Sequence, residues 1–317
     1  MKETHWSTRT AQEIVENVAK VIIGKKPVIE RALAAVIAQG HLLIEDVPGV
    51  GKTMLAKSIS VSIGCTFKRI QFTPDLLPSD IVGVSIYNQG TGEFQFRPGP
   101  VMSQVVLVDE INRATPKTQS ALLEAMEELQ VSVDGVTRPL ERPFVVMATQ
   151  NPIEYEGTFP LPEAQLDRFL MRISMGYPSF AEELSVIEGQ EKTHPIDQLE
   201  AVASSDDVIK LQDAAKNVYV DTAVREYIVS LIEATRNHED VSLGASPRAS
   251  LGMFRAVRAM AIFRDRDYVI PDDVKELAYA VLAHRLILSS AARMRGLQTR
   301  QVIDGLLESV AVPGASC

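Results

Sequence analysis

The fold of this chain is decided by one stretch of sequence, Glu45-Asp46-Val47-Pro48-Gly49-Val50-Gly51-Lys52-Thr53. The apolar run His41–Ile44 precedes it and predicts a buried strand, and Met54–Ile59 follows it and predicts the start of a helix. A strand, a glycine-rich turn, a Lys-Thr pair and a helix in this order form a P-loop. The glycines allow backbone amides to approach phosphate oxygens, and the N-terminus of the helix adds a positive potential. The stretch therefore predicts a phosphate-binding site.

Individual side chains of this loop have predicted roles. Lys52 can reach the β- and γ-phosphates of a bound nucleotide, and Thr53 can offer its hydroxyl oxygen to Mg²⁺. The strict pattern has glycine where this chain has Asp46, but Asp tolerates unusual turn geometry better than most residues. Taken alone, the stretch is also compatible with a glycine turn before an ordinary helix.

A second stretch, Val105–Glu110, removes most of that ambiguity. It is an apolar strand that ends in two adjacent carboxylates, the form known as Walker B, and it is uncharged until its end, as a central strand of a parallel sheet should be. Asp109 can orient the shell of Mg²⁺, and Glu110 can polarise an attacking water beside the γ-phosphate. Alone, the two carboxylates would more simply belong to a solvated loop, but a P-loop upstream favours the catalytic interpretation.

The composition is that of an ordinary globular protein long enough for two domains. The chain has 317 residues, 46% of them hydrophobic and 23% charged, and 32 basic residues face 41 acidic ones, so the formal net charge is −9. A dedicated nucleic-acid binder needs clustered Lys and Arg, which this balance disfavours. Cys65 and Cys317 form no metal-ligand spacing, and no run approaches the length of a membrane span. We therefore expect a reducing, cytoplasmic setting.

Helical and strand patterns alternate through the first half of the chain, which predicts an α/β fold with a parallel sheet covered by helices. Two helices are expected between Thr10 and Gln39. The segments that follow are strands near 41–45, 66–71, 105–109 and 144–148 and helices near 53–63 and 116–129.

Two predicted hairpins interrupt this alternation. Val84–Tyr87 and Glu93–Arg97 alternate in polarity on either side of the Gly-rich turn 88–92, and Val131–Leu140 contains an Asp-Gly turn. An α/β core does not need such hairpins to close, so they are candidates for moving or contacting parts. A merely decorative hairpin is equally compatible with the sequence.

Beyond Tyr177 the strand signal fades and helices follow one another. The Ser246-Pro247 pair places a capping residue before a proline at the first position of one of these helices. The sequence therefore predicts a nucleotide-binding α/β core over residues 1–190 and an all-α lid over residues 191–317. The expected helices span 181–189, 205–217, 222–237, 247–263, 272–284 and 300–310.

Three further side chains are candidates for the catalytic site. Asn151 follows a predicted strand beside the Walker B strand, where an amide can hold the attacking water, although an Asn-Pro turn is the simpler alternative. Arg168 can act as an arginine finger in a neighbouring subunit, unless it pairs with Asp167 or Glu163 of its own chain. Arg248 lies in the first turn of its helix, where the helix dipole disfavours a cation unless it meets an anion such as a phosphate.

Taken together, these motifs resemble those of the MoxR family of AAA+ ATPases, within the group that carries a helix-2 insert and a pre-sensor-1 hairpin. The similarity extends from about Val15 to Pro313. In this comparison Val84–Arg97 would be the helix-2 insert and Val131–Leu140 the pre-sensor-1 hairpin. The segments that carry the resemblance are Glu45–Thr53, Phe72–Asp80, Val108–Ala114, Ala148–Pro152, Glu163–Phe169 and Gly244–Ala249.

The resemblance implies a role for each candidate residue. Asn151 would be the sensor-1 residue, Arg168 the finger acting in trans and Arg248 the sensor-2 residue. Asp46 is similar to the residue that this family carries, whereas Lys25 replaces a frequent Gln near the expected adenine pocket. The residues expected to contact the nucleotide are Val21, Ile22, Gly24, Pro48, Gly49, Val50, Gly51, Lys52, Thr53, Met54 and Arg248, with Thr53 and Asp109 at Mg²⁺.

The resemblance further implies a homo-oligomeric ring, most simply a hexamer, and a partner protein with a von Willebrand factor A domain. The family is associated with chaperone-like remodelling that helps to mature or insert metal cofactors in client complexes. We therefore expect an Mg²⁺-dependent ATP hydrolase that remodels client proteins.

Three alternatives stay open at this point. A magnesium-chelatase-like ATPase subunit would insert a metal into a porphyrin with a dedicated partner. A nucleic-acid motor would share both hairpins, but the first hairpin has one acid and one base, Glu93 and Arg97, and the second turns on Asp134-Gly135. Neither hairpin is therefore built to grip phosphates. A nucleotide-gated scaffold without turnover would not need Glu110.

Overall fold

The structure is a computed structural model of the chain and describes residues 2–151, 157–189 and 194–313. Three sequence features lie outside the described residues: Pro152 of the Asn-Pro pair, the predicted domain boundary at 190/191, and Cys317.

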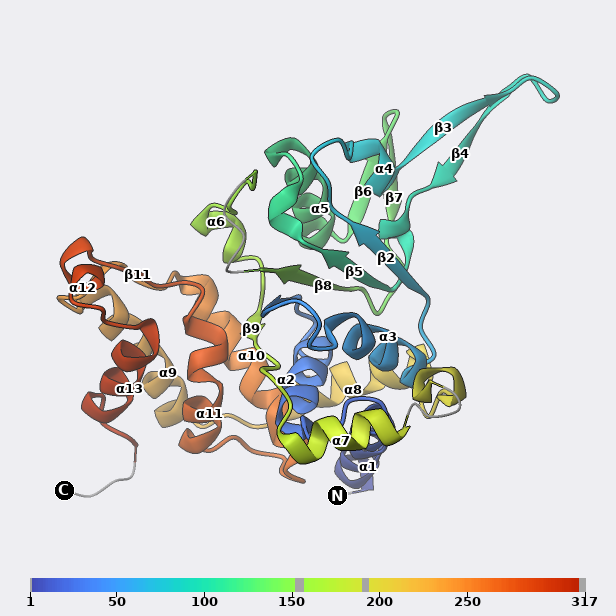
Figure 1. The fold of residues 1–317 in the computed structure, drawn as a ribbon. Coiled ribbons are helices and arrows are strands. Elements are labelled where there is room, and N and C mark those ends of the chain that lie inside the picture. Colours follow the sequence, from blue (N-terminus) through green and yellow to red (C-terminus); the bar gives the residue numbers. More distant parts are fainter. Residues whose placement is uncertain (1, 152–156, 190–193, 314–317) are drawn as a thin grey trace.

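A central sheet lies between helices on its two faces (Figure 1). The helices of the first half are α1 (Lys2–Ala19), α2 (Lys26–Ile37), α3 (Lys52–Ser62), α4 (Pro78–Val82), α5 (Pro116–Glu128), α6 (Glu163–Leu166) and α7 (Phe180–Gly189).

The central sheet has five strands, all paired in parallel, in the spatial order β2-β5-β8-β1-β9. The four strands that the sequence predicts are confirmed, and β9 adds a three-residue edge strand that is too short for its pattern to be detected. Because the strands are parallel, their carboxyl ends meet at one edge, where α/β proteins bind ligands. The strands are β1 (Leu42–Glu45), β2 (Phe67–Gln71), β5 (Val105–Asp109), β8 (Val145–Gln150) and β9 (Met171–Ile173).

The two-residue period of the strands divides the interior into two cores. Val105 and Leu107 belong to one core, together with side chains of α2 and α3. Val106 and Val108 belong to the other, together with side chains of α5. All four are fully buried, which explains why this segment is continuously apolar in the sequence.

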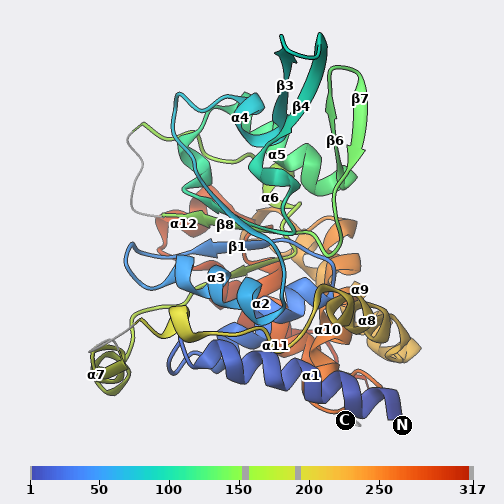
Figure 2. The ribbon, with the colours of Figure 1, turned by 90° about the vertical axis from the view of Figure 1, so that its right-hand side faces the viewer.

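Both predicted hairpins are present, and both project from the same end of the molecule (Figures 1 and 2). Arg138 of the shorter hairpin stacks on the ring of Phe96 in the longer one, 3.9 Å from the ring centroid. Near the tip of the longer hairpin, Tyr87 and Phe94 are 52% and 74% exposed, which leaves apolar surface available for contact. The strands are β3 (Gly83–Asn88), β4 (Glu93–Pro98), β6 (Gln130–Val133) and β7 (Val136–Pro139).

Beyond Tyr177 the described part of the chain is helical, as the sequence predicts, apart from one small antiparallel ribbon of β10 and β11 and an isolated bridge between Tyr219 and Tyr268. Its strands have three and two residues, too few for an alternating pattern to be detected. Ser246 is the N-cap of α10, and its hydroxyl accepts a hydrogen bond of 3.1 Å from the Arg248 amide, so the predicted cap is confirmed. The elements are α8 (Ser205–Asn217), α9 (Thr222–Asn237), β10 (Val241–Leu243), α10 (Pro247–Phe263), α11 (Pro271–Leu282), β11 (Ile287–Leu288), α12 (Ser290–Met294) and α13 (Thr299–Ser309).

The predicted lid helices share a hydrophobic core with the N-terminal helices. α8 and α10 pack against α1 and α2, and one cluster of buried side chains runs continuously from Ile14 and Ile29 to Leu211 and Met253. The division into two units, 1–190 and 191–317, therefore stays a prediction. None of the helices in the described residues combines the length and the hydropathy that crossing a membrane requires.

Candidate active site

The P-loop connects β1 to α3 at the carboxyl edge of the sheet. Gly49 and Gly51 have φ angles of 85° and 92°, in the left-handed region that glycine adopts without strain. Gly51 is also the residue before α3, so the free amide groups of the first helical turn lie next to the loop. Pro48 and Gly49 are exposed and Val50, Gly51, Lys52, Thr53 and Met54 are half-buried, so the loop is accessible to a ligand.

Asp46, the departure from the strict P-loop pattern, fastens the loop to the segment that follows β9. Its Oδ2 accepts hydrogen bonds from the Met175 amide at 2.6 Å, the Gly176 amide at 2.7 Å and the Ser174 hydroxyl at 2.9 Å. Burial by itself would raise the pKa of the Asp46 carboxyl, but the hydrogen bonds to the carboxylate outweigh burial and lower that pKa. The aspartate at the position where the strict pattern has glycine therefore stabilises the loop through these three hydrogen bonds.

Lys52 and Thr53 are the first two residues of α3. The Nζ of Lys52 donates a hydrogen bond of 2.6 Å to the carbonyl oxygen of Asp46, so the ammonium group lies over the loop that would receive the phosphates. This position agrees with the phosphate contact that the sequence predicts for Lys52.

Asp109 ends β5 at the same edge of the sheet, and both of its oxygens have partners. The Thr149 hydroxyl donates to Oδ1 at 3.2 Å, and the Arg69 Nε donates to Oδ2 at 2.5 Å. Thr53 and Asp109 supply the oxygen ligands that Mg²⁺ prefers, so the residues fit this cation. The ion pair shows in addition that Arg69 and a cation would use the same carboxylate.

Glu110 follows directly and is held in a left-handed backbone conformation, with φ 56° and ψ 53°. Such a conformation is uncommon outside glycine and is often found at functional sites. Its Oε2 accepts hydrogen bonds from the Gln71 side chain at 2.8 Å and from Arg113 at 3.1 Å, and its amide donates to the Thr149 hydroxyl at 2.9 Å. The carboxylate is therefore engaged by neighbours, while the Glu110 side chain stays 29% exposed.

Asn151 follows β8 directly, and β8 lies between β1 and β5 in the sheet. The residue is only 7% exposed, at the edge that carries the P-loop on one side and Asp109 on the other. The sequence-predicted set Lys52, Thr53, Asp109, Glu110 and Asn151 therefore gathers at one edge of the sheet.

The predicted adenine pocket involves the turn between α1 and α2, which contains Val21, Ile22 and Gly24. Ile22 is buried, Val21 is half-buried and Gly24 is exposed. The Nζ of Lys25 donates a hydrogen bond of 2.8 Å to the carbonyl of Tyr177 and so joins this turn to the segment that leads from β9 into α7. The turn and the Asp46 anchor thus contact the same stretch of chain.

Arg168 and Arg248 meet at one carboxylate, that of Glu127 in α5. The Nη2 of Arg168 lies 2.9 Å from Glu127 Oε2, and Arg248 pairs with Oε1. Arg168 thus has an intramolecular partner in the described residues, but that partner is neither Asp167 nor Glu163. Arg248 meets an anion, as the helix dipole requires, and the anion is a carboxylate of the same chain.

Hydrogen bonds and a buried ion pair hold the backbone near these arginines. Asp167, beside Arg168, accepts hydrogen bonds from the Ser246 hydroxyl at 2.6 Å and from the Nε of Arg285 at 2.7 Å. The Arg285 side chain is 4% exposed, and this burial lowers its pKa while Asp167 opposes the shift. The buried pair fixes the start of α10, and hence Arg248, against the segment that carries Arg168.

Arg168 and Arg248 lie at the opposite edge of the sheet from the P-loop. The Leu170 amide donates a hydrogen bond of 2.8 Å to the carbonyl of His41, and these residues directly precede the parallel strands β9 and β1. The four residues of β1 separate this edge from the P-loop by roughly 13 Å, at about 3.3 Å per residue. A cavity of about 370 Å³ opens beside the two arginines. In one chain, the structure does not bring them to Lys52.

A phosphate-binding loop and a carboxylate-tipped strand, meeting at one edge of a parallel sheet, are what ATP-hydrolysing P-loop proteins have in common, and this chain is a protein of that class. Its residues 41–171 match the model of the ATPase family associated with various cellular activities (AAA), and residues 233–306 match the AAA lid domain. The chain belongs to the MoxR family of AAA+ ATPases and is an ATP hydrolase.

Similar proteins cover nearly the whole chain. The uncharacterized protein YeaC of Bacillus subtilis is 56% identical over 94% of this chain and 93% of its own length. The chaperone MoxR1 of Mycobacterium tuberculosis is 47% identical over 96% of this chain and 82% of its own length. A crystal structure from Cytophaga hutchinsonii, of a protein assigned as an ATPase, has a TM-score of 0.92 and 41% identity, covering 98% of this chain and 97% of that one. The whole fold is therefore shared.

Sequence reasoning missed several partners of the candidate residues. Arg69 and Gln71 occupy alternate positions on β2, so both reach the carboxylates at the end of the neighbouring β5. Their spacing of two, next to the Walker B strand, is a signal that could have found them. Glu127 and Thr149 carry no comparable signal, because only the tertiary fold brings them to Arg168 and Asp109.

Proposed function

We propose that the chain is one subunit of a ring that hydrolyses ATP between neighbouring copies and uses this reaction to remodel client proteins. The observation that carries the proposal is the separation of Arg168 and Arg248 from Lys52 and Glu110, at opposite edges of one sheet. A head-to-tail contact would bring the arginine edge of one copy against the P-loop edge of the next. Such heterologous contacts close into rings, and the hexamer is the form we expect.

The proposed chemistry assigns one task to each candidate residue. Lys52 and the P-loop amides hold the phosphates, and Glu110 with Asn151 orients the attacking water. Mg²⁺, held by Thr53 and Asp109, would offset negative charge on the phosphates. Arg168 of the adjacent copy stabilises charge on the transferred phosphoryl group, a contribution of about 10³–10⁵ in rate in related enzymes. Arg248, which is expected from the sequence to contact the nucleotide, would do so from the same side as Arg168.

The remodelling role is supported by the relatives and by the hairpins. One relative is named as a chaperone, and the projecting hairpins expose Tyr87 and Phe94 at the end of the molecule away from α1. Exposed apolar side chains on a projecting element suit contact with unfolded or partly folded protein. We further propose a partner with a von Willebrand factor A domain and a client that receives a metal centre.

The alternatives are less well supported. A nucleic-acid motor would carry several phosphate-binding cations on its projecting hairpins, but the longer hairpin has Arg97 alone, balanced by Glu93, and Arg138 of the shorter one is engaged by the Phe96 ring. A magnesium-chelatase-like subunit would use the same ATP site, so the client alone distinguishes it. A scaffold without turnover is not supported, since Glu110 stands at the Walker B position.

The test uses a variant that binds ATP without hydrolysing it. Glu110→Gln with ATP and Mg²⁺ should form a stable ring, seen by native mass spectrometry, and should co-purify client and partner proteins. The matched control is the double variant Lys52→Ala, Glu110→Gln, which loses the phosphate contact and should neither assemble nor enrich them. If Glu110→Gln with saturating ATP stays monomeric and enriches nothing beyond the control, the proposed function is wrong.

A further inference from the structure

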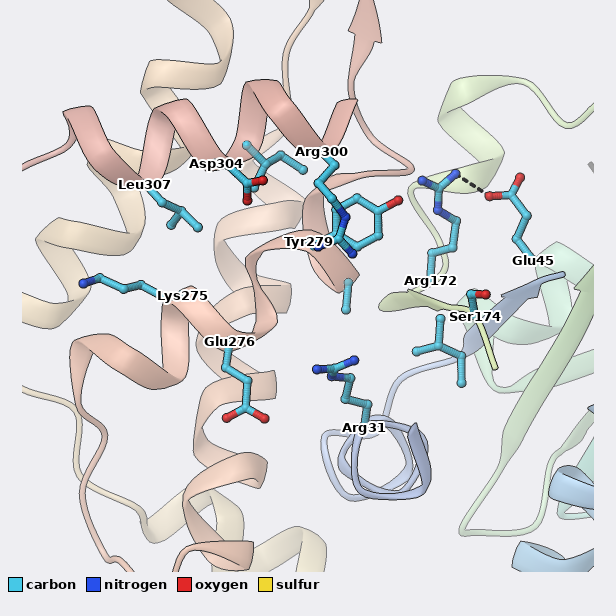
Figure 3. Close-up of a pocket in the computed structure, with 13 residues that line it drawn as sticks. Arg31, Glu45, Arg172, Ser174, Lys275, Glu276, Tyr279, Arg300, Asp304 and Leu307 are labelled. Atoms are coloured by element: carbon cyan, nitrogen blue, oxygen red, sulfur yellow. Dashed lines mark ion pairs between the residues drawn. The ribbon is translucent and has the colours of Figure 1, made fainter. Parts of the chain in front are cut away.

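A cavity of about 240 Å³ lies on the far side of the edge strand β9, between that strand, α2 and the C-terminal helices α11 and α13 (Figure 3). Arg31 reaches it from α2, Arg172 from β9, Tyr279 from α11 and Arg300 from α13. None of the residues assigned to the ATP site lines it. The cavity is small compared with the roughly 300–1,000 Å³ of sites for drug-sized ligands.

The acidic side chains around this cavity are largely neutralised by other partners. Glu45 pairs with Arg172 at 2.6 Å, and Glu276 pairs with Arg264 at 3.1 Å, outside the lining. Asp304 is then the one remaining acid of the lining, opposite the cations of Arg31 and Arg300, whereas Lys275 lies 3.8 Å from Asp272, outside the lining. The cavity therefore has an excess of positive charge.

Arg31 is the least satisfied of these cations. Its Nε is buried and has no hydrogen-bond partner among the described residues. A buried donor without an acceptor is unfavourable by an amount comparable to a lost hydrogen bond, and native structures keep few of them. Figure 3 shows the Arg31 guanidinium directed at the open space below Tyr279 and Arg172. Because Nε itself is closed to solvent, an anion in that space would meet the outer nitrogens of the guanidinium and offset the charge of this half-buried side chain.

The side chain of Arg300 is positioned by an aromatic ring at the same cavity. Its guanidinium lies 4.1 Å from the centroid of the Tyr279 ring, and Arg172 lies 6.0 Å from the same centroid. Stacking on an aromatic face fixes the guanidinium plane and leaves its N–H edge free to donate. The preorganised guanidinium of Arg300 on α13 and that of Arg31 on α2 together match the paired oxygens of a phosphate.

We propose that this cavity binds a small phosphate-bearing anion, held by Arg31 and Arg300 with Lys275 in support. The source is either free inorganic phosphate or diphosphate, or the phosphoryl end of a nucleotide. The site is connected to the P-loop, because Ser174 lines the cavity and its hydroxyl donates to Asp46 at 2.9 Å. Glu45, held by Arg172, is the residue directly before Asp46. An anion in the cavity would therefore act on the two contacts that hold the start of the P-loop, the Ser174–Asp46 hydrogen bond and the Arg172–Glu45 ion pair.

The test is calorimetric titration of the full chain carrying Lys52→Ala, which removes the phosphate contact of the P-loop. Separate titrations with orthophosphate, pyrophosphate and ADP distinguish the sources. We expect saturable binding of at least one, weakened about tenfold or more, or ~1.4 kcal/mol, by Arg31→Gln and by Arg300→Gln. Arg9→Gln, an exposed substitution on α1 with the same charge change, is the matched control and should leave affinity unchanged.

The outcomes separate the proposal from the proposed function, because binding is measured without hydrolysis. Arg300 is exposed on α13, so Arg300→Gln should fold even if Arg31→Gln does not. No saturable binding of any of the three anions overturns the proposal. So does binding that Arg9→Gln weakens as much as Arg31→Gln and Arg300→Gln do, since the effect would then reflect net charge alone.

Discussion

The carboxylate of Asp46 accepts a hydrogen bond of 2.6 Å from the backbone amide of Met175. This contact ties the start of the P-loop to the segment after the edge strand, two parts of the chain that are 129 positions apart. Because the amides of Met175 and Gly176 and the hydroxyl of Ser174 all meet one oxygen, the position of the loop depends on the negative charge of Asp46.

Asp46→Asn should therefore destabilise the protein by about 1–3 kcal/mol, the range for hydrogen bonds to a buried charged group. Ser174→Ala, which removes one of the three bonds, is the matched control and should have a smaller effect. The measurement is urea unfolding at neutral pH.

The same variant has a defined pH signature. The pKa of Asp46 is lowered below its ordinary value of 3.8 in the folded protein, so its contribution is complete above that value and is lost as the pH falls through the folded-state pKa. The stability difference between wild type and Asp46→Asn should shrink in strong acid. A difference that stays constant down to the acid limit of folding would contradict the charge-based account.

Arg69→Ala should lower the Mg²⁺ concentration that supports half-maximal nucleotide binding. Arg69 and the cation use the same carboxylate of Asp109, so removal of the arginine removes a competitor. Because the Arg69 side chain is 52% exposed, the effect is modest, up to about fivefold for an ion pair of ~1 kcal/mol.

The Mg²⁺ prediction is checked by the fluorescence of a labelled ATP analogue at a series of Mg²⁺ concentrations. Lys68→Ala is the matched control, since this exposed neighbour on β2 is not the partner of Asp109. An equal shift in both variants, or no shift in Arg69→Ala, would show that Arg69 does not compete with the cation.

His41 should make folding sensitive to mild acid. Burial lowers its pKa from 6.5 to about 4, while the hydrogen bond to the Met126 carbonyl opposes the shift and Arg255 adds to it. Its Nδ1 accepts a hydrogen bond of 3.0 Å from the Val146 amide, which requires the neutral ring. Between pH 6.5 and about 4 the unfolded chain binds a proton that the folded protein excludes.

Stability should accordingly be full above pH 6.5 and fall by about 3 kcal/mol as the pH approaches 4, at ~1.4 kcal/mol per pKa unit. His41→Asn keeps a side-chain acceptor without a titrating ring, so its stability should depend less on pH across this window. The measurement is urea unfolding at several pH values, and identical slopes in wild type and variant would exclude His41 as the cause.

Arg248→Ala should leave the ATP affinity of the isolated subunit unchanged and lower turnover of the assembled protein by about tenfold or more. The reason is its place with Arg168 at the edge remote from the P-loop of its own chain. Arg293→Ala, on the exposed helix α12, is the charge-matched control. Loss of ATP affinity in monomeric Arg248→Ala would mean that this arginine reaches its own nucleotide.

Much of the fold could be predicted because its signals are local. The apolar strands before Asp46 and Asp109, the glycine turn and the capping Ser246 each determine nearby backbone structure. The edge strand β9 and the β10–β11 ribbon could not be predicted, because strands of two or three residues are too short to show a periodic pattern. The shared core of α1, α2, α8 and α10 depends on packing between distant segments, which a single sequence does not reveal.

The candidate site divides in the same way. Asp109 ends its strand, Glu110 and Asn151 follow theirs directly, and Lys52 and Thr53 begin the helix after the P-loop, so parallel pairing is enough to bring them to one edge. Arg69 pairs with Asp109, 40 positions away, and Glu127 pairs with Arg168, 41 positions away. These contacts depend on the register of β2 and on the placement of α5, which the sequence does not reveal.

The central claim is that ATP is hydrolysed between two copies of the chain, and the most direct test is to mix two inactive variants. Lys52→Ala removes the phosphate contact on one edge, and Arg168→Ala removes the arginine on the other. Each alone should be inactive as an ATPase. In a mixture, some junctions pair an intact P-loop with an intact Arg168, so activity should reappear in proportion to those junctions. Absence of any recovery across all mixing ratios, with mixed assemblies demonstrated by native mass spectrometry, would contradict the account.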